Sequence, residues 1–169
     1  MPTQDTTIGG TSSNSYVTLA ECNSFWSDKR LYSSSVDAAS DDSKKRAIIW
    51  ATQAVDDSVA WYGEMADSKQ ALQWPRVGAF DRSGTEISSS ILPQFLKDAV
   101  AELAGLYIEE NRDADPDTKG FSSLSVGSLA MTIDKLDRRH VLPDSVRRRV
   151  SWYGRVKGTG GGAVQLGRT

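Results

Sequence analysis

Arginines are the residues of this sequence with the clearest chemistry, because five of them gather near its carboxyl end. They are Arg138, Arg139, Arg147, Arg148 and Arg149. A guanidinium group donates several hydrogen bonds in one plane and pairs well with phosphates and carboxylates. Trp152 and Tyr153 follow shortly after, and aromatic rings stack on nucleic-acid bases. The cluster predicts a basic face that contacts phosphates or an acidic protein surface.

The rest of the sequence does not support catalytic chemistry. The single histidine, His140, lies beside arginines with no nucleophile motif near it. The single cysteine, Cys22, has no partner for a disulfide or for a cysteine zinc site. The glycine-rich run 158–162 resembles a phosphate-binding loop but lacks the lysine and hydroxyl residue that end one. We therefore expect no enzymatic activity and no cofactor.

Carboxylates that could hold a metal ion also occur in unsuitable patterns. Asp113, Asp115 and Asp117 alternate as the ligands of an EF-hand loop do, but the glutamate expected at the twelfth position is absent. Adjacent pairs such as Asp56–Asp57 fall on predicted helices, where neighbours point about 100° apart. These pairs are typical of solvated faces, so we expect no metal site.

The charge of the chain is divided between its two ends. The protein has 169 residues and a net charge of −2, with −9 in residues 1–134 and +7 in residues 135–169. Such asymmetry is typical of an arm that meets an acidic surface or a nucleic acid, although the two ends could also neutralise each other within one fold. The sequence shows neither a run of about 18 apolar residues nor a signal-peptide pattern. We expect a soluble protein that is made in a cytoplasm.

Apolar residues at spacings of three and four predict a mainly α fold, a small domain of about four helices. The expected helices cover residues 18–31, 41–63, 93–110 and 143–154. Thr18 and Glu21 have the spacing of a capping box at the start of the first helix. Gly63 and Gly154 are expected to end the second and fourth helices.

The predicted domain, residues 16–154, lies between two arms. Residues 1–15 lack any period and predict a flexible N-terminal arm, and residues 155–169 predict a Gly-rich basic C-terminal arm. Within the domain, residues 64–90 predict a long loop, and alternation in residues 121–133 predicts a short strand or hairpin. Because two strands alone are marginal in water, we expect this hairpin to pair with another copy or to lie against the helices.

The long loop contains the sequence QALQWPR at Gln70–Arg76. Two interpretations of its aromatic, proline and basic residues remain open. Trp74, Pro75 and Arg76 could anchor the loop to the core, or they could contact a partner, since Trp and Arg are frequent interface anchors.

Several segments, taken in their order, resemble one family. They are Tyr16–Glu21 (YVTLAE), Trp50–Thr52 with Val55–Asp56, the QALQWPR segment, Pro93 before an Ala-rich helix, and Val126–Ser128. Together they resemble the head-tail connector proteins of tailed phages, also called adaptor or head-completion proteins. Some members carry the label DnaT-like single-stranded-DNA-binding protein. The resemblance covers residues 16–152.

This resemblance implies a structural protein of the virion neck, between capsid and tail, made in the host bacterial cytoplasm. It implies a homo-oligomeric ring, commonly of twelve copies, that lies below the portal protein, extends the DNA channel and docks tail, neck or stopper proteins. It implies portal contacts in the C-terminal arm, at Arg155, Lys157, Val164, Gln165, Leu166 and Arg168. The hypothesised contacts between subunits or with the tail are Trp74, Pro75, Arg76, Leu129, Met131 and Ile133. DNA would pass without sequence-specific contact, and no membrane is involved.

A single-stranded nucleic-acid-binding protein of phage replication is the alternative. The five arginines would then contact phosphates, and Trp152 or Tyr153 would stack on bases. The acidic residues 1–134 argue against it, because they would repel DNA. The two alternatives differ in salt dependence, since phosphate contacts predict an affinity that falls steeply as salt rises.

Overall fold

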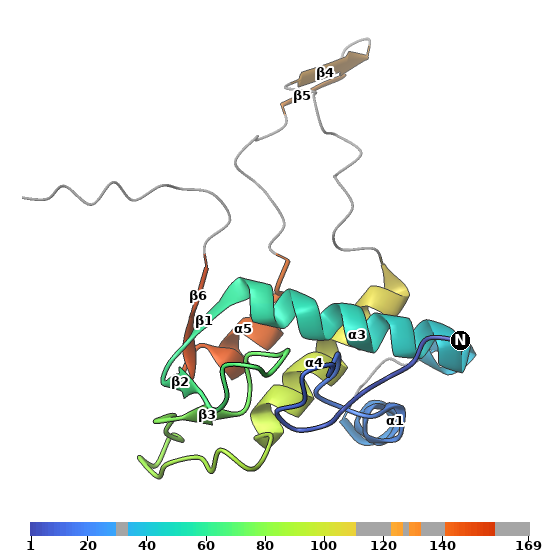
Figure 1. Cartoon of the computed structure of the whole chain (residues 1–169). Helices are drawn as coiled ribbons and strands as arrows, with labels where there is room; N and C mark the ends of the chain where they lie inside the picture. The colour runs from blue at the N-terminus through green and yellow to red at the C-terminus, as the bar shows by residue number, and fades with distance from the viewer. Residues whose placement is uncertain (30–33, 111–122, 127–128, 133–140, 158–169) are drawn as a thin grey trace, which may run out of the picture. The chain divides into compact units, whose positions relative to one another are not determined.

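A computed structural model describes residues 1–29, 34–110, 123–126, 129–132 and 141–157 of the chain, which form a mainly helical fold (Figure 1). The helices are α1 (Leu19–Lys29), α2 (Ser34–Ala38), α3 (Asp41–Ser58), α4 (Gln94–Glu109) and α5 (Asp144–Val150). The strands are β1 (Val59–Trp61), β2 (Glu64–Met65), β3 (Arg76–Val77), β4 (Ser123–Val126), β5 (Leu129–Thr132) and β6 (Gly154–Val156). The predicted fold class is confirmed. No helix in these ranges combines the length and apolar character needed to cross a membrane.

The chain divides into two compact units. Residues 1–112 and 141–157 form the first unit, and residues 113–140 and 158–169 form the second. The described part of the second unit is the antiparallel hairpin of β4 and β5, in which Val126 pairs with Leu129. The strands confirm the hairpin expected from the alternation in this part of the sequence.

Helices α3 and α4 form the centre of the first unit, where they pack against each other. Their buried residues recur at three and four, as the apolar period predicts. These residues include Ile48, Ala51 and Val55 of α3 and Leu96, Ala99, Val100 and Leu103 of α4. Helix α1 adds Cys22, Phe25 and Trp26 to the same core. The indole Nε1 of Trp26 donates a hydrogen bond of 2.8 Å to the Ala101 carbonyl oxygen, which ties α1 to α4.

The observed starts of the helices match the predicted starts more closely than the observed ends match the predicted ends. At α1 the predicted capping box is present: the Glu21 amide donates to the Thr18 hydroxyl at 3.2 Å, and the Thr18 amide donates to the Glu21 carboxylate at 2.8 Å. Helices α3 and α5 end several residues earlier than Gly63 and Gly154. The residues directly after α3 form β1, and after a turn at residues 151–153 the chain forms β6, which pairs with β1. The Ser-rich stretch before α3 also contains α2, where Val36 is buried.

Residues 1–15 pack on the domain, which differs from the flexible arm that the sequence predicts. The side chain of Gln4 donates to the Val17 carbonyl at 2.8 Å and accepts from the Leu19 amide at 3.2 Å, in the first turn of α1. The Gly10 carbonyl accepts a hydrogen bond of 3.0 Å from the Ala71 amide in the long loop. Polar residues hold this segment through hydrogen bonds, and such contacts produce no apolar period in the sequence.

The QALQWPR segment anchors the long loop to the core, as one of the two interpretations predicts. The Trp74 side chain is 1% exposed and its ring centroid lies 5.7 Å from that of Trp61 and 5.6 Å from that of Phe95. Pro75 is buried beside it. In this fold Trp74 and Pro75 are therefore not available for the hypothesised contacts with a subunit or with the tail.

Arg76 is also buried, because the turn after β1 uses its guanidinium group. Its Nε donates to the Tyr62 carbonyl at 2.8 Å and its Nη2 donates to the Gly63 carbonyl at 2.6 Å. Gly63 has a φ of +73°, and a Cβ at this position would clash with the Val77 carbonyl oxygen. Glycine is therefore required at this turn, and Arg76 is a structural residue and not a surface contact.

Candidate functional site

The two Trp-Tyr-Gly sequences of the chain, at 61–63 and 152–154, lie side by side. Trp61 pairs with Gly154, and the Tyr62 amide donates a hydrogen bond of 2.9 Å to the Tyr153 carbonyl. A Cβ on Gly154 would lie 2.6 Å from a methyl carbon of Val59, so glycine permits the close approach of β6 to β1. This pairing holds the carboxyl end of α5 against the end of β1.

One side of α5 and the strand β6 line a groove with a volume of about 540 Å³, which we call the α5–β6 groove. Asp144, Arg147, Arg148 and Ser151 recur at three and four from the start of α5, so they form one stripe that faces the groove. Tyr62 and Arg155 line it as well. The groove therefore combines residues from two parts of the chain that are about 90 positions apart.

The three consecutive arginines of α5 have different environments. Arg149 faces α4, where its Nε lies 2.8 Å from the Glu102 carboxylate and its Nη1 lies 3.8 Å from that of Asp98. Among the described residues, the ion pair of Arg147 is a long one, 3.6 Å between its Nη1 and the Asp144 carboxylate. Arg148 has no ion pair among the described residues. The basic face predicted on this helix is thus reduced to Arg147 and Arg148.

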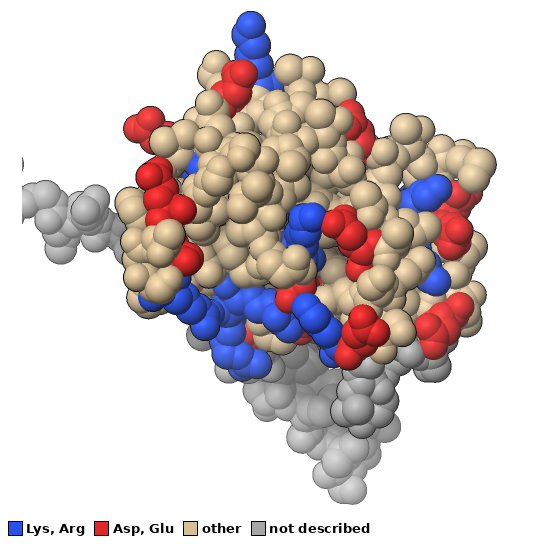
Figure 2. Space-filling view, turned by 90° about the horizontal axis from the view of Figure 1, so that it is seen from below, with Lys and Arg blue, Asp and Glu red and all other residues tan. Residues whose placement is uncertain are grey.

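Arg155 adds a further cation to the groove from β6, where it is exposed and has no ion pair within the described ranges. Figure 2 shows Lys and Arg side chains gathered in a band along one edge of the face seen from below. Within the described part of the chain, Asp144 is the carboxylate beside these three guanidinium groups, which create a positive potential suited to anions.

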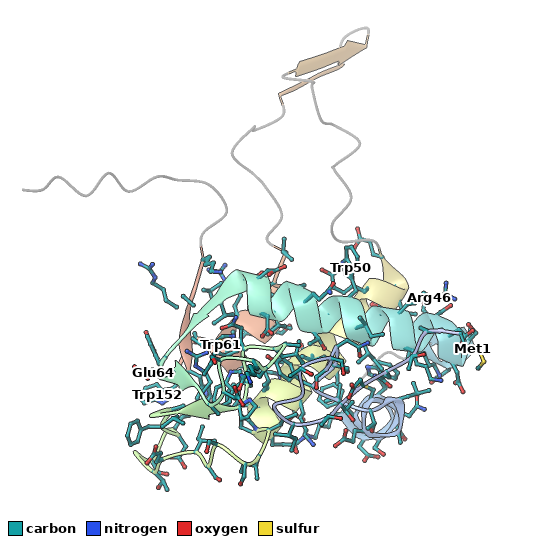
Figure 3. All side chains as sticks on the ribbon, viewed as in Figure 1. Met1, Arg46, Trp50, Trp61, Glu64 and Trp152 are labelled. Carbon is teal, nitrogen blue, oxygen red and sulfur yellow. The ribbon has the colours of Figure 1, made fainter. Side chains whose placement is uncertain are left out.

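Two exposed aromatic residues accompany these cations. Tyr62 in the groove and Trp152, which directly follows the groove residue Ser151, are each 56% exposed. Figure 3 places Trp152 at the same end of the first unit as Trp61 and Glu64, away from Trp50 and Arg46 on α3. Tyr153 is different, because its ring stacks on Phe95 with a centroid distance of 3.5 Å. Of the two aromatics expected to stack on bases, Trp152 is available and Tyr153 is not.

Arg155 and Lys157 belong to the folded domain, not to a C-terminal arm. Arg155 pairs with Ala60 in the β1–β6 ladder, and the Lys157 amide donates to the Ser58 carbonyl at 2.7 Å. The predicted boundary at residue 155 is therefore too early, because residues 155–157 belong to the first unit. The remaining predicted arm residues lie outside the described residues: Val164, Gln165, Leu166 and Arg168. Arg138, Arg139, Ile133 and His140 also lie outside them, while Leu129 and Met131 lie in β5.

Asp56 does not lie on a solvated face, which corrects a second prediction from the sequence. Its carboxylate accepts hydrogen bonds from the Tyr16 hydroxyl at 2.7 Å and from the Gln73 amide at 3.0 Å. The Tyr16 oxygen in turn accepts from the Trp74 amide at 3.1 Å. Burial raises the pKa of Asp56 to about 6 and raises the pKa of Tyr16 well above its usual value. This network joins α3, the N-terminal segment and the long loop, so its role is structural.

Sequence reasoning missed Tyr62, Asp144 and Arg155 as groove residues. The signal that could have pointed to Tyr62 is the repeated Trp-Tyr-Gly, whose two copies meet in space. Sequence repetition alone does not indicate which segments pair, and three-residue strands are too short to show a period. The α5–β6 groove could therefore be assembled only from the tertiary structure.

Fold and groove together define a small, mainly helical domain that carries a basic surface groove with exposed aromatic residues. The chain belongs to the family described as "Putative DnaT-like ssDNA binding protein", whose model matches residues 3–163. No curated protein and no solved structure matches the chain. The family description names single-stranded DNA and does not mention a head-tail connector.

Proposed function

We propose that this protein binds single-stranded DNA through the α5–β6 groove. The observation that carries the proposal is the convergence of Arg147, Arg148 and Arg155 in one groove with the exposed ring of Tyr62. Guanidinium groups contact phosphates along a backbone, and aromatic rings stack on unpaired bases with about 1–3 kcal/mol per base. The family description supports the same class of ligand.

The acidic character of the chain limits this binding without preventing it. Repulsion between the acidic surface and DNA is screened beyond about 8 Å at physiological ionic strength. The groove arginines act at direct contact, where screening is weak. We therefore expect modest affinity that depends on the three groove arginines.

A titration of a fluorescein-labelled 20-nucleotide single strand, followed by anisotropy at 50 and 200 mM salt, tests the proposal. If the groove arginines neutralise two or three phosphates, the slope of log K against log salt is between about −1.4 and about −2.1, so the affinity falls about 7-fold to about 20-fold between the two concentrations. Arg148→Glu should weaken binding at least tenfold. Arg82→Glu is the matched control, because Arg82 is exposed on the turn at 81–85, outside the groove.

Absence of binding at 50 mM salt would overturn the proposal. Equal losses in Arg148→Glu and Arg82→Glu would also contradict it, because binding would then depend on total charge and not on the groove. A duplex of the same sequence should bind more weakly, since its bases are not free to stack on Tyr62 or Trp152.

A second candidate function is the ring-forming connector of a phage neck that the sequence resemblance implies. The observation in its favour is the β4–β5 hairpin, which forms part of a separate unit and contains two strands in the described residues. A two-stranded hairpin is marginally stable alone, so a neighbouring copy or a portal subunit is a reasonable partner. In this role the groove would face DNA in a channel or an acidic surface of a partner.

Native mass spectrometry of the purified protein, alone and mixed with its portal ring, tests the second candidate. A ring of the protein, or one bound copy per portal subunit, is the expected result. A monomer that does not bind the portal would exclude the connector function and leave single-strand binding as the better explanation of the groove.

A further inference from the structure

Asp144 is a carboxylate in a groove that otherwise suits phosphates. It lines the groove at the start of α5, and its side chain is 79% exposed. A carboxylate is favourable in the first turn of a helix, but it repels a phosphate backbone, so Asp144 lowers the affinity of the groove for phosphates. Its effect on an unpaired base is the opposite, because a carboxylate accepts hydrogen bonds from the donors of a base edge.

Asp144 and Arg147 form a pair with hydrogen-bonding capacity to spare. The shortest distance between them is 3.6 Å, too long for a strong charge-assisted hydrogen bond. Neither side chain has another ion pair among the described residues. The pair therefore offers a planar acceptor and a planar donor side by side, on consecutive turns of one helix face.

Guanine is the base whose edges match such a pair best. It carries two adjacent donors, N1–H and the N2 amino group, which a carboxylate can accept together, and two acceptors, O6 and N7, which a guanidinium contacts. Thymine has one donor between two carbonyl oxygens, and those oxygens repel a carboxylate. Cytosine and adenine present one amino group each, so they offer the carboxylate a single hydrogen bond.

We propose that Asp144 and Arg147 form a guanine-binding subsite in the α5–β6 groove, with Tyr62 as the nearby stacking face. The inference rests on the proposed single-strand binding and adds base preference to it. Arg148 and Arg155, which have no ion pair within the described ranges, hold the phosphates on either side of the bound base. The groove thus separates base recognition from backbone recognition.

Anisotropy titrations with the full chain and labelled 12-nucleotide strands test this subsite. One strand is all thymidine, and the others carry a single central guanosine, cytidine, adenosine or inosine. The guanosine strand should bind between about fivefold and a hundredfold more tightly than the all-thymidine strand, the range of a good bidentate base contact. Inosine, which lacks the N2 amino group, should lose most of this gain.

Asp144→Asn should remove the guanine preference, so that the guanosine and all-thymidine strands bind with equal affinity. Asp41→Asn is the matched control, since Asp41 is an exposed aspartate at the first residue of α3 and lies outside the groove. It should keep the preference of the unmodified protein. Circular dichroism of both variants is used to check that the helices form, and the inosine strand tests the subsite without any variant.

The possible outcomes separate this inference from the proposed function. Equal affinity of the unmodified protein for the guanosine and all-thymidine strands overturns the subsite but leaves single-strand binding standing. A guanine preference that survives in Asp144→Asn assigns the recognition to other residues and also overturns it. No binding of any strand at low salt removes the proposed function itself.

Discussion

Replacing Asp56 with asparagine should make the stability of the protein less dependent on pH. The carboxylate lies at the carboxyl end of α3 and binds the Tyr16 hydroxyl and the Gln73 amide. Burial raises its pKa to about 6, whereas the unfolded chain has the usual value of 3.8. The folded protein therefore binds this proton more tightly than the unfolded chain does.

The two pKa values of Asp56 give the direction and the size of its effect on stability. Because the folded pKa is raised, the contribution of Asp56 to stability is full below about pH 4 and is lost as the pH rises through about 6. A rise from 3.8 to about 6 corresponds to about 3 kcal/mol. Asparagine is neutral at every pH and keeps an acceptor oxygen, so Asp56→Asn should exceed the unmodified protein in stability at pH 7 and lose this advantage by pH 4.

Urea unfolding followed by tryptophan fluorescence, at half-unit steps from pH 4 to 7.5, measures this difference. Subtracting the two curves removes the titration of groups that both proteins share. Asp57→Asn is the matched control, because Asp57 is the exposed neighbour on the same helix. Parallel pH profiles of Asp56→Asn and the unmodified protein would refute the reasoning, since the carboxylate would then titrate alike in the folded and unfolded states.

Three further predictions concern the core and the carboxyl end. Trp74→Ala should lower the free energy of unfolding by about 3–5 kcal/mol in urea titrations, as for other buried aromatic residues. The control Trp152→Ala, on the surface, should change it by less than about 0.5 kcal/mol. An unchanged urea midpoint for Trp74→Ala would place the Trp74 ring outside the core. Burial raises the pKa of the Cys22 thiol to about 12. Ellman's reagent should therefore label Cys22 in urea but not in the folded protein at pH 8. Rapid labelling of the folded protein would contradict the burial of this thiol. Removal of residues 155–169 should lower the melting temperature measured by circular dichroism, because it breaks the β1–β6 pair. Removal of residues 158–169 keeps this pair and should leave the melting temperature unchanged. Equal melting temperatures of the two truncated proteins would show that the β1–β6 pair adds no stability.

Much of the helical framework could be predicted from the sequence because its causes are local. The capping box at Thr18 and Glu21 and the apolar stripe from Leu96 to Leu103 depend on residues three or four positions apart. The alternation that predicts the β4–β5 hairpin is local as well. Such patterns are present in the chain before any tertiary contact forms.

Other features could not be predicted, because they depend on partners far away in the sequence. The polar residues of the N-terminal segment are ordered by contacts such as that of Gly10 with Ala71 in the long loop. Asp56 has the sequence context of an exposed helix residue, yet Tyr16 and Gln73 surround it. The end of α3 is decided by β6, which begins almost a hundred residues later.

The fold class, most of the helix starts and a basic region near the carboxyl end can be predicted from the residues alone, and burial of Trp74 is one of the two alternatives that they leave open. The positions of the arginines depend on the tertiary structure: Arg149 pairs with Glu102 of α4, while Arg147 and Arg148 join Arg155 in the groove. Helix formation follows from short-range periodicity, whereas the charge on a surface depends on the ion pairs that form when the chain folds. Two short segments with the same Trp-Tyr-Gly sequence meet across the fold, and that meeting creates the groove.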